Sequence, residues 1–428
     1  MGAADNLRID PDRLWDSIEE TAQFGATPKG GIKRLTLSDE DRQVRDWFKR
    51  ACEAAGCTVT LDAMGNQFAR RSGRDATLPP IAIGSHLDTQ PTGGCYDGVI
   101  GVLSGLEVLR TLHDTGYETT APVEVVNWTN EEGSRFAPAM LASGVFAGVF
   151  EQGWAEDRQD REGTRFGDAL DRIGARGTVP CGGHPFSAHF ELHIEQGPIL
   201  EAEDKVIGIV TGVQGMRWYE VEITGRESHA GSTPMPLRRD ALAAAGEIIG
   251  AVEAIGKAHA PDAVATVGLL ECRPNSRNVV PGSVFLTVDL RHPDDAVLDA
   301  METGLESVLR RIETERGVTA ALSRVWDSPA VRFDQDCIAS VRRAAAEAGL
   351  PAREIVSGAG HDSAYVARVA PTSMVFVPCR EGLSHNEEEH AEYSHVIAGA
   401  DVLLRAVLDT DRRLAEQAGV HGGADGGN

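Results

Sequence analysis

Residues 84–102 read GSHLDTQPTGGCYDGVIGV and place one histidine and two aspartates within a run that contains five glycines. Glycine costs packing area and backbone entropy, so such a run indicates a backbone that must approach something closely. The residues before it, PPIAIG, are typical of a buried strand. The residues after it, DGVIGVLSGLEVLRTLHDTG, predict a helix that ends at Gly116. The stretch therefore predicts a strand, a loop carrying His86, Asp88 and Asp97, and a helix.

The same plan recurs along the chain. Residues 121–136, APVEVVNWTNEEGSRF, and residues 187–203, SAHFELHIEQGPILEAE, each begin as an apolar strand and continue into acidic residues. Residues 337–350 predict a further helix, and residues 370–379 predict a further buried strand. Strands that alternate with helices and end in polar clusters indicate an α/β sheet whose site lies beyond the carboxyl ends of its strands.

The pattern changes within residues 213–328, where the predicted order is strand, helix, strand, strand, helix, strand. This βαββαβ order is typical of a ferredoxin-like domain that folds by itself. We therefore predict a discontinuous catalytic α/β domain, residues 1–212 and 329–418, interrupted by the inserted ferredoxin-like domain. The glycine-rich residues 419–428 are predicted to form a disordered tail.

Charge and cysteine usage restrict the classes of partner. The 428 residues carry a formal net charge of −24, which disfavours nucleic acid and anionic membranes as partners. An anionic substrate would then need a binding site with a local positive charge. The chain has no apolar run that approaches a membrane span or a signal core. The seven cysteines are scattered and form no CxxC pair, which favours reduced thiols and a cytoplasmic location.

Histidines and carboxylates gather at predicted strand ends and in the loop GLSHNEEEH. Nitrogen and oxygen donors without a thiolate suit one or two divalent ions such as Zn²⁺, Mn²⁺ or Co²⁺. If two ions bind, one carboxylate must bridge them, and Asp97, flanked by glycines, suits that position. The candidate metal ligands are His86, Asp97, Glu132, His193 and His385.

The adjacent pair Glu131 and Glu132 needs a separate explanation. Neighbours within a strand point to opposite faces, but at the turn NEEG both side chains can face one cleft. One would then serve as a ligand, and the other as a general base beside an activated water. Two solvated acids in a turn are the alternative, and that interpretation must also explain the similar clusters at the other strand ends.

Short motifs identify a family that the chain resembles. GSHLDT, GGCYDG, NWTNEEGSRF, ELHIEQGP, SHAGSTPM, RNVVPG, DLRHP, GAGHDS and SHNEEEH follow one another in the order found in the zinc-dependent hydantoinase/carbamoylase amidohydrolases. These belong to the aminoacylase and metallo-carboxypeptidase superfamily. The resemblance spans roughly residues 10–408. It implies a catalytic α/β domain with an inserted lid and dimerisation domain, and therefore a homodimer.

The resemblance also implies the roles of the site residues. His86 and His193 would bind one ion, Glu132 and His385 the other, and Asp97 both. Glu131 would deprotonate the attacking water and later protonate the leaving nitrogen. The carboxylate of Asp88 would orient His86.

Five further residues are predicted to contact a substrate that carries a carboxylate. Arg291 ends a predicted strand and could grip that carboxylate. Gln196, Asn278 and Gly360 match substrate-contacting positions of the family. His229 matches a residue that reaches into the neighbouring subunit's site and would stabilise the oxyanion.

The predicted function is removal of the carbamoyl group from an N-carbamoyl-L-amino acid or from N-carbamoyl-β-alanine, giving the amino acid, ammonia and carbon dioxide. Allantoate amidohydrolase, and an aminoacylase or peptidase of the same superfamily, are the alternatives within this chemistry. A non-catalytic metal-binding scaffold is the alternative outside it, and the presence of Glu131 disfavours it. For Asp362 we predict the structural role of capping a helix.

Overall fold

The computed structural model describes residues 6–422, with side chains described as far as residue 417. These residues divide into two compact units. The second unit is Gly212–Val331, and the described residues before and after it form the first. The observed insertion thus begins one residue before the predicted range, 213–328, and ends three residues after it.

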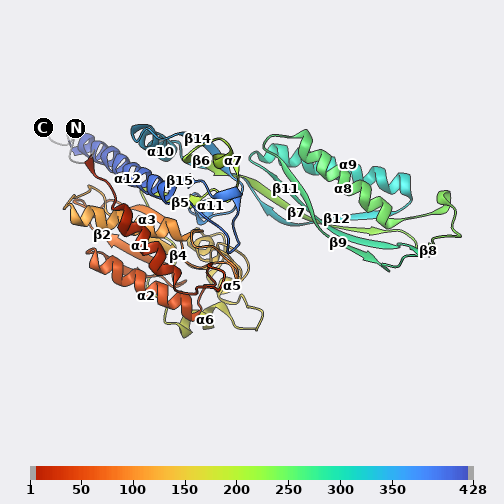
Figure 1. Ribbon diagram of the computed structural model, residues 1–428, viewed down its shortest axis with the longest axis horizontal. Coiled ribbons are helices and arrows are strands. Elements are labelled where there is room, and N and C mark those ends of the chain that lie inside the picture. The colour runs from red at the N-terminus through yellow and green to blue at the C-terminus, as the bar shows by residue number, and fades with distance from the viewer. Residues whose placement is uncertain (1–5, 423–428) are drawn as a thin grey trace. The chain divides into compact units, whose positions relative to one another are not determined.

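The first unit is built on a mixed sheet (Figure 1). Its strands are β1 (Thr58–Leu61), β2 (Gln67–Arg71), β3 (Ile81–His86), β4 (Val123–Trp128), β5 (Ala188–Ile194), β6 (Ile207–Val213), β13 (Val331–Arg332), β14 (Ala352–Ser357) and β15 (Thr372–Val377). Their order is β1-β2-β4-β3-β5-β15-β6-β13, and β14 pairs with β6. The central strands β4, β3, β5 and β15 run parallel to one another, so their carboxyl ends meet at one edge of the sheet.

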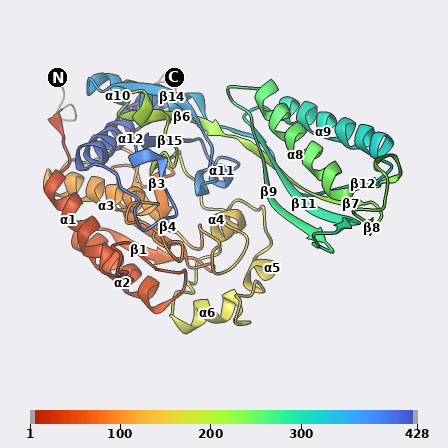
Figure 2. The ribbon, with the colours of Figure 1, turned by 45° about the vertical axis from the view of Figure 1, so that its right-hand side comes forward.

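Helices cover both faces of these central strands, which explains why β3, β4, β5 and β15 are buried throughout. Side chains alternate along β3. Ile83 and Ser85 meet glycines of one helix, α3, while Ala82 belongs to a buried cluster that includes residues of α4 and α11. In Figure 2, α1, α2 and α3 lie on the same flank of this unit. The helices are α1 (Pro11–Ala22), α2 (Asp39–Ala54), α3 (Val99–Asp114), α4 (Leu141–Phe146), α5 (Gln152–Glu156), α6 (Phe166–Arg172), α7 (Ile199–Ala202), α10 (Gln335–Glu347), α11 (Asp362–Val366) and α12 (Tyr393–Gly422).

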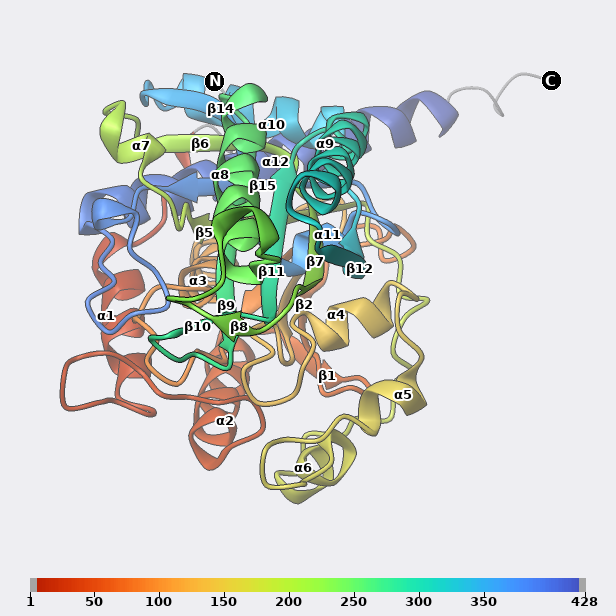
Figure 3. The same cartoon turned by 90° about the vertical axis from the view of Figure 1, so that its right-hand side faces the viewer.

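The second unit has the predicted ferredoxin-like order. Its antiparallel sheet runs β12-β7-β11-β9, and two helices cover one face of it, side by side in Figure 3. Alternate residues of β7, from Arg217 to Ile223, are buried beneath those helices, while Trp218 on the other face is 44% exposed. A short ladder, β8 with β10, lies outside the sheet. The elements are β7 (Gly215–Thr224), β8 (Ser228–His229), α8 (Ala241–Ala258), β9 (Val264–Arg273), β10 (Val279–Val280), β11 (Ser283–His292), α9 (Asp295–Arg316) and β12 (Thr319–Ser328).

The predicted tail, residues 419–428, lies largely outside the described range. Helix α12 continues to Gly422, and residues 423–428 are not described. All seven cysteines are free. Among the described residues, no helix combines the length and the apolar character that crossing a membrane requires.

Candidate metal centre

The parallel strands bring the predicted ligands to one place. His86 is the last residue of β3, His193 lies near the end of β5, Glu132 lies in the turn after β4, and His385 lies in the loop after β15. Asp97 lies in the glycine-rich loop that leads into α3. Side chains far apart in the sequence therefore meet because their strands end at the same edge.

Asp97 lies at the centre of this group. Its Oδ1 is 3.1 Å from His193 Nε2 and 3.6 Å from His86 Nε2, and its Oδ2 is 3.4 Å from His385 Nε2. Two of the three sets of potential ligand atoms among the described residues contain it, His86–Asp97–His193 and Asp97–Glu132–His385, and the third is Glu191–His193–His361. Asp97 is common to the first two sets, which is the arrangement that a bridging carboxylate requires.

The histidine tautomers fit metal binding. Nδ1 of His86 is 2.9 Å from the carbonyl oxygen of Asp88, and Nδ1 of His193 is 2.9 Å from that of Ile194. A carbonyl can only accept, so each Nδ1 carries the proton and each Nε2 lone pair faces Asp97. Nε2 of His86 is buried and has no hydrogen-bond partner within the described residues. Nε2 of His193 accepts a hydrogen bond from Gly98 N at 3.1 Å. The donors present therefore suit divalent ions.

The glycine run has a steric cause. Gly98 has a φ of +67°, and a Cβ at this position would overlap the ring of His86. A Cβ at Gly94 would overlap the carboxylate of Glu389. Bare backbone at these two positions lets the loop carry Asp97 close to His86.

Three non-glycine residues next to the site adopt left-handed backbone conformations. Asn130, Gln196 and His385 have φ values of 61°, 56° and 56°. Such conformations cost about 1–3 kcal/mol each and cluster at functional sites, where the surrounding structure holds them. Asn130 is held by its side-chain amide, which donates to the carbonyl of Phe136 at 2.8 Å. Asn130, with this left-handed conformation, immediately precedes the pair Glu131–Glu132.

Burial and charge act in opposite directions on Asp97. Burial disfavours its ionised form, but the electrostatic influence of the three neighbouring histidines, His193 first, outweighs burial and keeps the pKa of Asp97 well below its ordinary value. Burial also opposes the charged form of His86, and the nearby carboxylates, Glu131 first, raise the pKa of His86 above its ordinary value despite this. The site therefore concentrates negative charge that a cation would neutralise.

Glu131 and Glu132 face the same region, as the turn NEEG predicted. Oε2 of Glu131 is 3.4 Å from His86 Nε2, and Oε2 of Glu132 is 3.5 Å from His385 Nε2. Glu132 also accepts from the backbone and the side-chain amide of Gln90, at 3.1 and 2.6 Å. Burial raises the pKa of Glu131 well above its ordinary value and that of Glu132 to about 7.

Asp88 acts differently from the prediction. Its backbone carbonyl, rather than its carboxylate, holds Nδ1 of His86, and the nearer carboxylate oxygen is 3.9 Å from that nitrogen. The carboxylate instead accepts from the backbone N–H groups of Glu131 and Glu132 at 3.3 and 3.4 Å. The hydrogen bond from His86 thus goes to the carbonyl, because the chain turns directly after His86, while the carboxylate stays within ion-pair distance. Asp88 therefore links the end of β3 to the turn after β4.

Gln196 and Gly360 also lie in the first unit. Nε2 of Gln196 donates to Asp97 Oδ2 at 2.9 Å and to Ser384 Oγ at 3.1 Å. Gly360 is exposed in the loop between β14 and α11, and a Cβ there would lie 3.0 Å from the terminal methyl group of Met140. Gln196 thus joins the ligand cluster directly, whereas Gly360 lies outside it.

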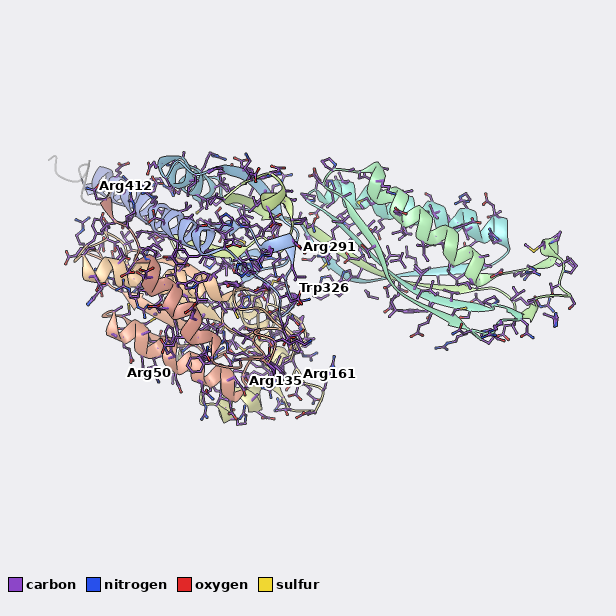
Figure 4. All side chains as sticks on the ribbon, viewed as in Figure 1. Arg50, Arg135, Arg161, Arg291, Trp326 and Arg412 are labelled. Atoms are coloured by element: carbon purple, nitrogen blue, oxygen red, sulfur yellow. The ribbon has the colours of Figure 1, made fainter. Side chains whose placement is uncertain are left out.

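The remaining predicted substrate residues lie in the second unit. His229 and Asn278 are exposed neighbours, because β8 pairs with β10 and Ala230 N donates to Asn278 O at 2.9 Å. Arg291 lies near the end of β11 and forms an ion pair with Asp289 at 2.8 Å. Figure 4 shows Arg291 and Trp326 at the same end of this sheet.

The predicted capping role of Asp362 is wrong. His361 occupies the N-cap position of α11 and makes no side-chain capping bond, and Asp362 is the first residue of the helix. Oδ1 of Asp362 instead accepts from Ser143 Oγ at 2.5 Å. The side chain is buried and contacts a serine of α4 rather than the first backbone N–H groups of α11.

Sequence reasoning missed Glu389, a buried carboxylate behind Asp97. Three successive glutamates in the loop GLSHNEEEH were the available signal, but nothing in that run distinguishes the inward residue from its neighbours. Burial raises the pKa of Glu389 to about 7.

Comparisons with known proteins identify the family of the chain. The sequence model of peptidase family M20/M25/M40 matches residues 82–409. The chain is 50% identical over 406 residues to the N-carbamoyl-L-amino-acid amidohydrolase of Rhizobium meliloti, covering 95% of this chain and 98% of that protein. It is 35% identical over 416 residues to the ureidoglycolate hydrolase of Oryza sativa subsp. japonica, covering 95% and 86%. It matches the crystal structure of a hydantoinase/carbamoylase-family amidase from Burkholderia multivorans with a TM-score of 0.92 and 57% identity, over 94% of this chain and 98% of that one. The resemblance drawn from the motifs is confirmed.

Proposed function

Because the chain belongs to peptidase family M20/M25/M40, we propose that it is an amidohydrolase that removes the carbamoyl group from N-carbamoyl-L-amino acids. The products are the amino acid, ammonia and carbon dioxide. One observation carries the proposal: Glu131 lies buried beside two sets of metal-type donors that share Asp97. The name of the relative from Rhizobium meliloti supports the choice of substrate.

Two divalent ions per subunit, Zn²⁺, Mn²⁺ or Co²⁺, are the proposed cofactors. His86 and His193 would hold one, Glu132 and His385 would hold the other, and Asp97 would take part in both. When bound, such ions polarise the carbonyl group of the substrate and lower the pKa of water. The donor set supports this assignment, because it contains only nitrogen and oxygen atoms.

Glu131 is the proposed general base and acid. Its carboxylate accepts a proton from the attacking water as that water adds to the carbamoyl carbon. It then delivers the proton to the amino-acid nitrogen as the C–N bond breaks. Burial raises the pKa of Glu131, which brings it toward the range in which a carboxylate can both accept and return a proton. Asp88 keeps Glu131 in place through the backbone N–H at 3.3 Å.

The substrate is proposed to bind through five residues, three of which lie in the second unit. Arg291 and the backbone at Gly360 bind the carboxylate, Gln196 and Asn278 bind polar atoms of the substrate, and His229 stabilises the oxyanion. We further propose that the second unit is a lid and a dimerisation domain, that the protein is a cytoplasmic homodimer, and that His229 serves the partner's site.

A second candidate function is hydrolysis of ureidoglycolate or allantoate. The identity to the ureidoglycolate hydrolase of rice favours it over the aminoacylase and peptidase alternatives. N-carbamoyl-β-alanine differs from the α-substrates by one methylene, for which a pocket discriminates by only about 1–3 kcal/mol. A non-catalytic scaffold is disfavoured, because it would have no need for Glu131 in this position.

The deciding experiment measures ammonia release after metal removal and reloading with Zn²⁺, Mn²⁺ or Co²⁺. The substrates are N-carbamoyl-L-amino acids, N-carbamoyl-β-alanine, ureidoglycolate, allantoate and, by release of acetate, an N-acetyl amino acid. The highest kcat/KM is expected for an N-carbamoyl-L-amino acid with reloaded protein. Equal or higher kcat/KM for ureidoglycolate or allantoate would reject the proposed substrate class. Full activity of the metal-free protein would reject the metal requirement.

A further inference from the structure

Glu389 is a buried carboxylate that no step of the proposed reaction uses. It lies in the loop between β15 and α12 and is 5% exposed, whereas its neighbour Glu388 is exposed. Burying a carboxylate is costly unless hydrogen bonds compensate for the lost water. Its position inside the protein therefore requires specific partners.

The first partners belong to the loop that carries Asp97. Oε1 of Glu389 accepts from the backbone N–H groups of Tyr96 and Asp97, each at 3.1 Å. A Cβ at Gly94 would overlap the Glu389 carboxylate, so the glycine at this position leaves the space that the side chain fills. Glu389 thus fixes the backbone of Asp97 directly.

The second partner belongs to the loop that carries His385. Oε2 of Glu389 is 3.0 Å from Ser384 Oγ, and the same hydroxyl is 2.9 Å from Asp97 Oδ2. A hydroxyl has one proton, so Ser384 is shared between the two carboxylates. Ser384 directly precedes His385, and Gln196 donates to both Ser384 and Asp97.

We propose that Glu389 is a positioning residue that joins the Asp97 loop to the His385 loop and thereby holds the bridging carboxylate and His385 in register for the metal ions. The inference rests on the proposed metal centre and is independent of which substrate the enzyme cleaves. Residues that orient metal ligands typically contribute 10–100-fold to metal affinity or activity, so an effect of about that size is expected here.

The test compares Glu389→Ala with Glu389→Gln and with Glu388→Ala, the exposed neighbour. Metal affinity is measured by dialysis against Zn²⁺ buffers, and the metal-free proteins are compared by hydrogen exchange of the amides of residues 92–98. Glu389→Ala should weaken Zn²⁺ binding by about 10–100-fold and should remove protection at Tyr96 and Asp97. Glu388→Ala should change neither quantity.

Glu389→Gln distinguishes a positioning role of Glu389 from a general loss of protein stability. Its amide oxygen can still accept from both backbone N–H groups, and its NH₂ group can donate to Ser384 while Ser384 donates to Asp97. Most of the Zn²⁺ affinity and the amide protection should therefore return. A glutamine variant as impaired as the alanine variant would overturn the proposal, and so would a Glu389→Ala protein with wild-type affinity and exchange.

If Glu389→Ala fails to fold, the variant Ser384→Ala tests the proposal instead. It removes the link to the His385 loop but keeps the bonds from Glu389 to Tyr96 and Asp97, so weaker Zn²⁺ binding with retained amide protection is expected. Unchanged Zn²⁺ binding would overturn the proposal. None of these measurements uses a carbamoyl substrate, so a wrong assignment of the substrate would leave their outcome unaffected.

Discussion

The proposed site residues of the two units differ in how they are held. In the first unit, His86, His193 and Asp97 are at most 5% exposed and contact side chains from several strand ends. In the second unit, His229 and Asn278 are exposed, and Arg291, whose side chain is about a third exposed, pairs with Asp289 of its own strand. A reaction centre gains from rigid positioning, whereas residues that receive a substrate must stay accessible. Changes in the first unit should therefore abolish turnover, and changes in the second should act on catalysis and binding to smaller degrees.

The largest effect is expected for Glu131→Gln. An amide cannot accept the proton of the attacking water, so kcat should fall by about 10²–10⁴-fold while the metal content stays at the wild-type level. Ammonia release and elemental analysis of the purified protein measure the two quantities. Glu151→Gln, an exposed residue at the start of α5, is the control. A Glu131→Gln enzyme with near wild-type kcat would exclude Glu131 as the base.

A smaller loss is expected for His229→Ala. Removing one donor to an oxyanion costs about 10²–10³-fold in kcat, with both metals retained. Subunits carrying His229→Ala are then mixed with subunits carrying His385→Ala. If His229 serves the partner's site, the mixed dimer contains one complete site and recovers activity. Verified mixed dimers without activity would place His229 in its own subunit's site.

Arg291→Ala should act mainly on KM. Hydrogen bonds to charged groups contribute about 1.5–3 kcal/mol, which corresponds to a KM increase of roughly 10–150-fold for a substrate with a carboxylate. The matched control substrate is the corresponding N-carbamoyl amino acid amide, whose KM should change little. An equal KM increase for both substrates would contradict carboxylate recognition by Arg291.

The smallest effect is expected for Asp289→Asn. Asp289 pairs with Arg291 at 2.8 Å and competes with a substrate carboxylate for the guanidinium. Both side chains are about a third exposed, and such pairs contribute roughly 0.2–1 kcal/mol, so the KM should fall by less than about fivefold. A higher KM in steady-state kinetics would show that Asp289 supports the orientation of Arg291 instead of competing for it.

The sequence predicted the parts of the site that depend on regular structure. Apolar runs that end in His86, His193 or the pair Glu131–Glu132 identify parallel strands, and the carboxyl ends of parallel strands meet at one edge. The glycines around Asp97 predicted a close approach of the backbone. The structure confirms this at Gly98, whose backbone lies so close to the ring of His86 that a Cβ would overlap it. The βαββαβ order likewise predicted the sheet of the second unit.

The parts that depend on irregular backbone could not be predicted. Asp88 binds through its carbonyl because of the local turn after β3, and no residue pattern encodes that choice. Asp362 begins α11 instead of capping it, a difference of one residue, and its carboxylate accepts from Ser143 of α4. Glu389 lies inside because its carboxylate accepts from the backbone of Tyr96 and Asp97, contacts that the sequence, with three equivalent glutamates, does not show.

The connection between the two units has a consequence for the history and the engineering of the gene. The chain leaves the first unit after β6 and returns in β13, and these strands are neighbours in the sheet, with Phe333 N donating to Thr211 O at 3.0 Å. The entry and exit points of the second unit are thus adjacent. A short hairpin could close that gap, so a deletion between Thr211 and Phe333 would remove the second unit and keep all five proposed metal ligands in one chain, and other modules could be inserted at the same junction.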